Sequence, residues 1–144
     1  MSLRNITILF ITFVGINHIN GQIITINPPF PTVNDVITVQ YDATQGNGGL
    51  VGISPVYAHT GVVTQSGLPS SWSYVQGNWG QADPNVLMND IGNNTHEITI
   101  DIDQFYGFPA GTNIAKLAFV FRNVDGSAEG KTATMGTFST QYIQ

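Results

Sequence analysis

The chain has 144 residues, nine acidic and four basic side chains, a formal net charge of −5 and no cysteine. This length predicts a single domain, and the acidic balance argues against nucleic acid and anionic membranes as partners, because both are bound through Lys and Arg. The lack of cysteine excludes disulfides, thiol catalysis and cysteine-bound metals, and in a small secreted domain it favours a bacterial source.

The first 21 residues are predicted to be a secretory signal peptide. Arg4 supplies the positive start, residues 6–16 are almost all apolar, and we expect cleavage after Gly21. The apolar run is shorter than the roughly 20 residues that span a bilayer, so an uncleaved anchor is the less favoured alternative. The mature chain, 22–144, would be secreted or cell-surface and carry a charge of −6, since loss of Arg4 leaves three bases against nine acids.

Short strand patterns separated by turn residues follow, and no segment keeps a helical period. Alternation is clearest in 36–43, where the face that carries Ile37 is expected to be the core face. Seven or eight antiparallel strands favour an all-β, immunoglobulin-like β-sandwich. The expected strands are 23–26, 36–43, 56–63, 72–76, 95–102, 114–121 and 138–143, with 84–89 as a short strand or turn, a hairpin loop at 92–94 and one helical turn at 103–109.

The sequence gives little support for an enzyme. Most acidic residues fall in predicted turns, where Asp replaces backbone hydrogen bonds, and no pair can be placed across a cleft as a glycosidase requires. Asp101 and Asp103 share one strand face and fit a solvated strand end, with a calcium site as the alternative. No nucleophile elbow, phosphate loop or metal-binding histidine spacing is present. We therefore expect a non-catalytic protein without a cofactor or metal.

A group of aromatic side chains is the strongest functional signal. Tyr57 and His59 lie two residues apart on one expected strand and therefore share a face, about 7 Å apart; Trp72 and Tyr74 repeat this on the next strand. If the strands pair, four rings line one surface. Flat rings pack on the apolar face of a pyranose, with about 1 kcal/mol from ~50 Å² of burial per ring. The alternative is that Trp72 or Trp79 is the buried core tryptophan common in sandwiches.

Six short motifs also occur in a specific order along residues 22–132. They are Asn27-Pro28-Pro29-Phe30-Pro31-Thr32, Val56-Tyr57-Ala58-His59-Thr60-Gly61-Val62, Trp72-Ser73-Tyr74-Val75, Thr95-His96-Glu97-Ile98, Phe105-Tyr106-Gly107 and Leu117-Ala118-Phe119-Val120-Phe121-Arg122-Asn123-Val124-Asp125-Gly126. In this arrangement the chain resembles the starch-binding β-sandwich modules found N-terminal to the catalytic domain of secreted bacterial α-amylases.

The resemblance implies a non-catalytic module that binds starch or a related α-glucan, polysaccharide or oligosaccharide, beside a catalytic glycoside hydrolase domain. The family's late-turn tryptophan has no counterpart here, so one platform is either missing or replaced, with Trp79 as the candidate replacement. The alternative is an immunoglobulin-like spacer or adhesion module without a sugar site; a small secreted hydrolase is a weaker third. From the rings and the resemblance together, the candidate carbohydrate-binding residues are Tyr57, His59, Trp72, Tyr74, Trp79, Asn123 and Asp125.

Overall fold

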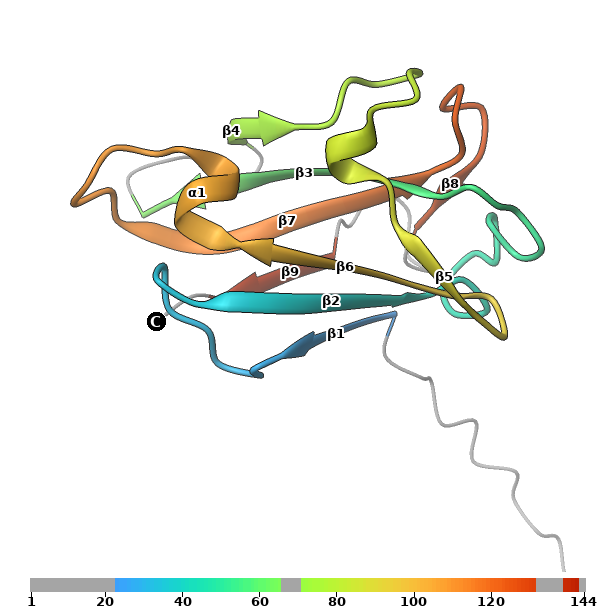
Figure 1. The fold of residues 1–144 in the computed structure, drawn as a ribbon, viewed down its shortest axis with the longest axis horizontal. Coiled ribbons are helices and arrows are strands. Elements are labelled where there is room, and N and C mark those ends of the chain that lie inside the picture. Colours follow the sequence, from blue (N-terminus) through green and yellow to red (C-terminus); the bar gives the residue numbers. More distant parts are fainter. Residues whose placement is uncertain (1–22, 66–70, 132–138, 143–144) are drawn as a thin grey trace, which may run out of the picture.

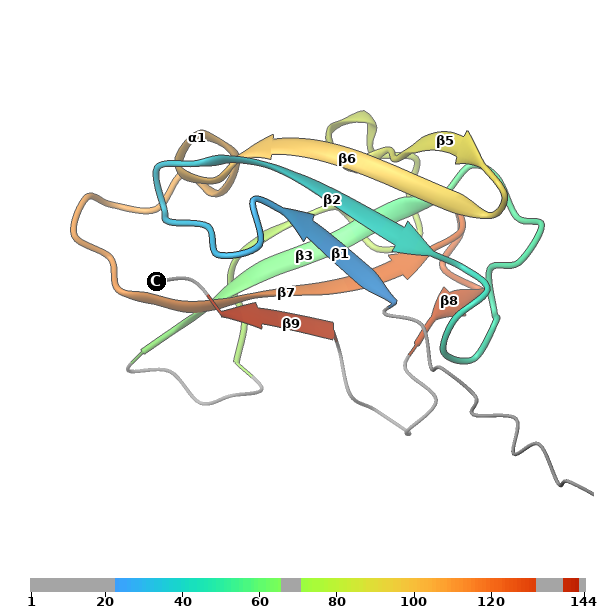
Figure 2. The ribbon, with the colours of Figure 1, turned by 90° about the horizontal axis from the view of Figure 1, so that it is seen from below.

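The computed structural model describes residues 23–65, 71–131 and 139–142. These residues form two antiparallel β-sheets that lie one over the other (Figures 1 and 2). The signal peptide expected at 1–21 lies outside the described residues. In the described part of the chain, no helix is long and apolar enough to cross a membrane.

The strand order confirms the immunoglobulin-like sandwich. The first sheet runs β1-β2-β6-β5 and the second β4-β3-β7, with β8 and β9 pairing with different stretches of the free edge of β7. In immunoglobulin notation, β1, β2, β6 and β5 correspond to the sheet ABED. The strands β3 and β7 correspond to C and F of the second sheet, and β4 to the additional strand C′. The strands are β1 (Ile24–Asn27), β2 (Val36–Asp42), β3 (Tyr57–Thr64), β4 (Ser73–Gln76), β5 (Asn89–Gly92), β6 (Thr95–Asp101), β7 (Ile114–Arg122), β8 (Glu129–Gly130) and β9 (Ser139–Tyr142); the connections hold η1 (Pro84–Val86) and α1 (Ile102–Tyr106).

The core lies between the sheets and follows the alternation of the strands. Ile37, Val39 and Tyr41 of β2 point inward and are at most 1% exposed, as expected for the Ile37 face. The Tyr41 ring stacks on Phe121 of β7 with the ring centroids 4.1 Å apart, which joins the two sheets. Burial of each such side chain is worth about 1.5–3 kcal/mol. Neither Trp72 nor Trp79 belongs to this core, so the alternative of a buried core tryptophan is wrong.

Turn and cap residues fix the ends of the elements near β6. Asn93 and Asn94 both have positive φ values, 53° and 59°, which is the geometry of a two-residue hairpin turn between β5 and β6. The Asp101 side chain accepts a hydrogen bond from the Gln104 N–H of α1, and Gly107 ends the helix in the left-handed conformation. Asp101 is therefore a helix cap, and the expected helical turn forms here.

Candidate functional site

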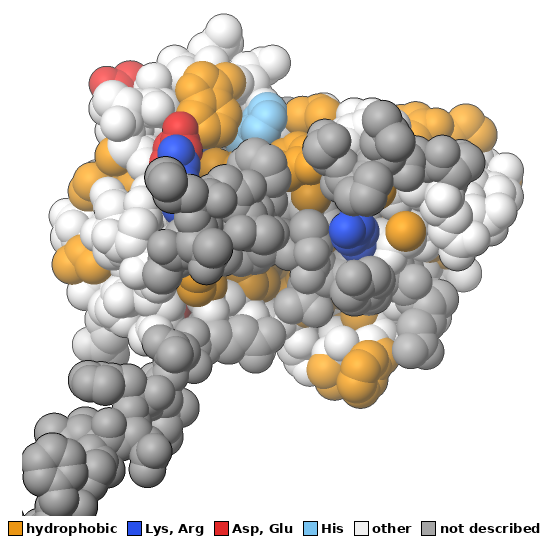
Figure 3. Space-filling model, turned by 180° about the vertical axis from the view of Figure 1, so that it is seen from behind, with side chains coloured by type: hydrophobic (Ala, Val, Ile, Leu, Met, Phe, Trp, Pro, Cys, Tyr) orange, Lys and Arg blue, Asp and Glu red, His pale blue; other side chains and the backbone are white. Residues whose placement is uncertain are grey.

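Alternation on β3 divides its side chains between the core and the outer face of the second sheet. Ala58 and Val62 belong to the core, and the register of β3 and β7 places His59 opposite Val120 on the outer face. The space-filling view in Figure 3 shows a histidine (pale blue) bordered by hydrophobic side chains (orange). Both tryptophans of the chain come to this region from the segment that follows β3.

Three rings meet on this face, and we call His59, Trp72 and Trp79 the ring cluster. The His59 ring stacks on Trp72 with centroids 5.8 Å apart and planes at 29°, and it meets Trp79 edge-on at 5.3 Å and 89°. The planes of the two indoles therefore differ by at least 60°, which is 89° minus 29°. Trp79 is 44% exposed, whereas His59 and Trp72 are half-buried. The cluster is a corner, not a flat row.

The His59 ring is fixed by a hydrogen bond as well as by stacking. Its Nδ1 lies 2.7 Å from the carbonyl oxygen of Gly77. A carbonyl only accepts, so Nδ1 carries the hydrogen, and in the neutral ring Nε2 is left as an acceptor. The ring cluster thus offers two aromatic faces and one nitrogen that can accept from a hydroxyl.

A buried cation, Arg122, lies behind Trp79. Its side chain is 0% exposed, and its guanidinium carbon lies 5.2 Å from the Tyr57 ring centroid and 5.8 Å from that of Trp79. It donates four hydrogen bonds to backbone carbonyls of two loops: Nη2 to Asn78 (2.6 Å) and Gln81 (2.9 Å), and Nη1 to Asn123 (2.9 Å) and Val124 (3.1 Å). Arg122 therefore ties the loop that carries Trp79 to the turn after β7.

Carbonyl dipoles and ring faces balance the charge of Arg122. In the described part of the chain, it forms no salt bridge, and its Nε has no hydrogen-bond partner. Burial lowers the pKa of the guanidinium, while Tyr57 and the Asp83 carboxylate act in the opposite direction. An arginine retains its proton under these conditions, so the two ring faces contact a permanent cation.

Trp79 rests directly on the turn after β7. Gly126 has φ +73°, and a Cβ built there would lie 2.5 Å from the indole Nε1. Only glycine combines this backbone conformation with so close an approach. The backbone next to Trp79 also touches the turn, since a Cβ on Gly80 would lie 3.2 Å from the Asp125 carbonyl oxygen. The candidate replacement for the missing aromatic residue thus lies against the late turn.

The polar residues of the late turn bond mainly to each other. Asn123 donates from Nδ2 to the Ser127 hydroxyl (3.0 Å) and accepts from the Ala128 N–H (3.1 Å). Asp125 accepts through one oxygen from both the N–H (3.0 Å) and the hydroxyl (2.6 Å) of Ser127, and these bonds lower its pKa. Both side chains shape the turn that supports Trp79.

Two residues expected beside His59 on one ring-lined surface lie elsewhere. Tyr57 is only 6% exposed and packs against the Arg122 guanidinium. Tyr74 has φ +52°, the pairing of β3 with β4 shifts register, and its ring meets Phe108 at 6.1 Å. The expectation of four rings on one face is therefore wrong, because the irregular β4 directs Tyr74 toward Phe108 and Tyr57 is buried beneath the Arg122 guanidinium. Sequence reasoning missed Arg122, although a cation that ends the most apolar strand was a usable signal.

No group of three His, Asp or Glu side chains within 23–65 and 71–131 is placed to hold a metal ion. The search among curated proteins gave no match. Residues 24–129, well over half of the chain, match the family model described as "Domain of unknown function (DUF8578)". The chain therefore belongs to the DUF8578 family.

Proposed function

We propose that the protein is a non-catalytic carbohydrate-binding module, and that its ring cluster binds starch or a related α-glucan. The observation that carries the proposal is the exposed indole of Trp79, held by Arg122 beside Trp72 and His59. A glucose ring has an apolar C–H face that packs on an aromatic ring and hydroxyls at its edge that bond to a neighbouring acceptor such as Nε2 of His59.

The angle within the ring cluster supports a curved glucan. Successive glucose rings of an α-1,4-linked chain rotate relative to one another, so one chain can meet two platforms that are not coplanar. The planes of Trp72 and Trp79 differ by at least 60° (89° minus 29°). A flat chain such as cellulose needs coplanar platforms. The corner geometry therefore favours α-glucan over β-glucan.

The expected affinity is modest. Each stacked ring contributes about 1 kcal/mol, and the ordering of a flexible oligosaccharide offsets part of that gain. Two stacked rings and one hydrogen bond of about 1 kcal/mol give about 3 kcal/mol before that cost, so we expect dissociation constants in the millimolar range or weaker. The hydrogen bonds from Arg122 to the Trp79 loop, which we call the Arg122 clamp, reduce the entropy that the protein loses on binding, since the loop is already held before a ligand arrives.

Affinity electrophoresis in gels that contain soluble starch or glycogen tests the proposal. We expect retardation of the protein, no retardation by a soluble β-glucan, and loss of retardation in Trp79→Ala. Phe30→Ala is the matched control, because Phe30 is the most exposed aromatic residue described (74%) and lies in the β1–β2 connection of the other sheet. Equal mobility in all gels would contradict the proposal.

The proposal extends to secretion and to the setting of the module. Arg4 and the apolar run 6–16 support export with removal of residues 1–21, and a module of this kind acts beside a secreted glycoside hydrolase. N-terminal sequencing of protein recovered from the culture medium tests the first point. A start at Gln22 is the expected result, and an intact Met1 in the medium would contradict it.

A structural spacer or adhesion module is the second candidate. It is favoured by a specific observation, namely that Trp79 also covers a buried cation and that Asn123 and Asp125 bond within their own turn. On this account the rings stabilise the fold and bind nothing. Trp79→Ala would then lower stability, while the unaltered protein would show no retardation in any glucan gel.

A further inference from the structure

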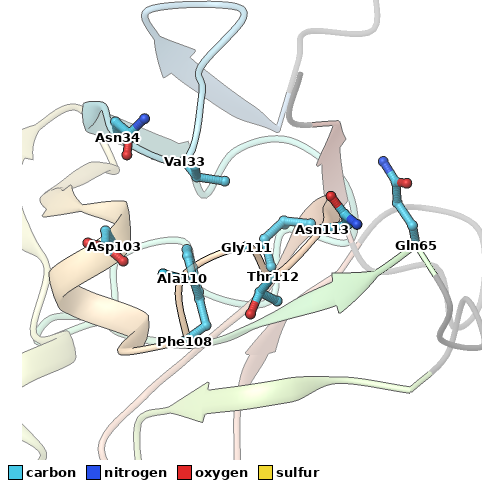
Figure 4. A pocket seen from close by; sticks show the side chains of 10 residues that line it. Val33, Asn34, Gln65, Asp103, Phe108, Ala110, Gly111, Thr112 and Asn113 are labelled. Atoms are coloured by element: carbon cyan, nitrogen blue, oxygen red, sulfur yellow. The ribbon is translucent and has the colours of Figure 1, made fainter.

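A hollow of about 540 Å³ lies at the other end of the sandwich from Trp79 and the turn after β7 (Figure 1). It is bordered by Val33 and Asn34 before β2, by Gln65 after β3, by Asp103 of α1 and by the loop 108–114 (Figure 4). Gln65 follows His59 by six residues, roughly 20 Å along an extended chain. Trp72 lies closer to the hollow, because the next residue, Ser73, pairs with Val62 near the end of β3. Its volume is within the range of small-molecule sites.

The polar side chains around this hollow are not used by the fold. Within the described ranges, no hydrogen bond joins the side chains of Asn34, Gln65, Asp103 or Asn113 to another residue. Figure 4 shows Asn113 and Gln65 at one side of the hollow and Asn34 and Asp103 at the other. These four side chains are exposed to solvent, so their polar groups are free to bond to a ligand that occupies the hollow.

Backbone hydrogen bonds hold the walls in place. The Gln65 N–H donates to the Asn113 carbonyl (3.0 Å), and the Ile102 N–H donates to the Asp35 carbonyl (3.1 Å). The Asp35 carboxylate in turn accepts from the N–H (2.7 Å) and hydroxyl (2.9 Å) of Thr32. Each wall is thus anchored to a neighbouring element, and a ligand would not have to order the loops.

The lining defines the chemistry of a ligand. Three amide side chains can both donate and accept, as hydroxyl groups require, and buried Phe108 and Ile114 provide an apolar base. Among the lining residues that the structure describes, Asp103 is the only charged side chain, and the net charge of the chain is −5, so anions are disfavoured. We propose that this hollow, the end pocket, binds a neutral, hydroxyl-rich molecule of one or two sugar rings, independently of the ring cluster.

An NMR titration of the ¹⁵N-labelled protein tests the end pocket. Glucose, galactose, xylose and maltose are the neutral probes and glucuronate is the anionic probe, each up to about 50 mM. With at least one neutral sugar we expect saturable shifts of the amide signals of Gln65, Thr112 and Asn113. Glucuronate should bind at least about threefold more weakly, and Asp103→Asn should remove that difference.

Three variants separate the possible outcomes. Asn113→Ala should weaken binding about tenfold, whereas Asn93→Ala, the same change on an exposed hairpin tip, should not. Trp79→Ala should leave the end-pocket shifts unchanged, so that failure of the ring cluster and failure of the end pocket are distinguishable. Absence of shifts at the lining amides with every neutral sugar, or equal binding by Asn113→Ala and the unaltered protein, would overturn the proposal.

Discussion

Replacement of Arg122 by Met should destabilise the protein and release the Trp79 loop. Methionine preserves much of the length and apolar contact of the side chain but donates no hydrogen bond. Four backbone carbonyls in two loops then lose their donor at once. Because one side chain makes all four bonds, the effect should exceed that of an ordinary surface substitution, which stays within about 0.5 kcal/mol.

The magnitude follows from these bonds. A hydrogen bond from a charged donor contributes about 1.5–3 kcal/mol, and the low end applies here because Asn78, Gln81 and Val124 are exposed and their carbonyls can regain water. Four bonds at that value give about 6 kcal/mol, and relief from burying an unpaired cation offsets about half. We expect the free energy of unfolding to fall by about 3 kcal/mol.

Urea unfolding followed by circular dichroism measures this loss of stability. Acrylamide quenching of tryptophan fluorescence in the folded state measures how accessible Trp79 becomes when its loop is released. Quenching should increase in Arg122→Met. Arg122→Lys should be intermediate, since an ammonium keeps the charge but donates at most three bonds from a single atom. A Met variant as stable as the unaltered protein, or one with unchanged quenching, would refute the assignment of Arg122 as the clamp.

Three further changes have definite expected outcomes. Gly126→Ala should cost about 1–3 kcal/mol more than Gly92→Ala, because both positions have positive φ but only the first Cβ meets the indole; equal costs in urea unfolding would contradict this. Burial lowers the pKa of His96, so the unfolded chain binds a proton at this residue more readily than the folded chain does. The contribution of neutral His96 to stability is therefore present above about pH 6.5 and is lost as the pH falls below it. In His96→Gln, the free energy of unfolding should fall less between about pH 7.5 and 5.5. Gly130→Ala places a methyl group against the Tyr41 hydroxyl and should cost about 2 kcal/mol, and Tyr41→Phe should restore part of it by removing an oxygen that has no partner among the described residues; no rescue in thermal unfolding would show that the hydroxyl is not the obstacle.

The fold was predictable because it depends on short-range patterns. Alternation on β2 places Ile37 and Tyr41 in the core, and the turn residues Asn93 and Asn94 end one strand and start the next. A period of two decides which face of a strand is buried, and a sandwich of this length has few alternative arrangements of such strands.

The candidate site was predictable only in part. Periodicity predicts that Tyr57 and His59 share an outer face of β3, but in the structure Tyr57 belongs to the core cluster whereas His59 is half-buried on the outer face. Periodicity does not predict which groups cover a face of a strand, so the burial of Tyr57 against Arg122 was not foreseen. The position of Tyr74 depends on a single positive φ value and a register shift, which leave no periodic signal. Contacts between distant loops, such as Trp79 on Gly126, were also outside the reach of local patterns.

Intrinsic fluorescence offers the most direct measurement of the central claim, because both tryptophans of the chain, Trp72 and Trp79, belong to the ring cluster. Titration with maltoheptaose should change the emission in a saturable way with a dissociation constant in the millimolar range, and cellohexaose should not. An emission spectrum that stays constant across the maltoheptaose titration would contradict glucan binding by the ring cluster.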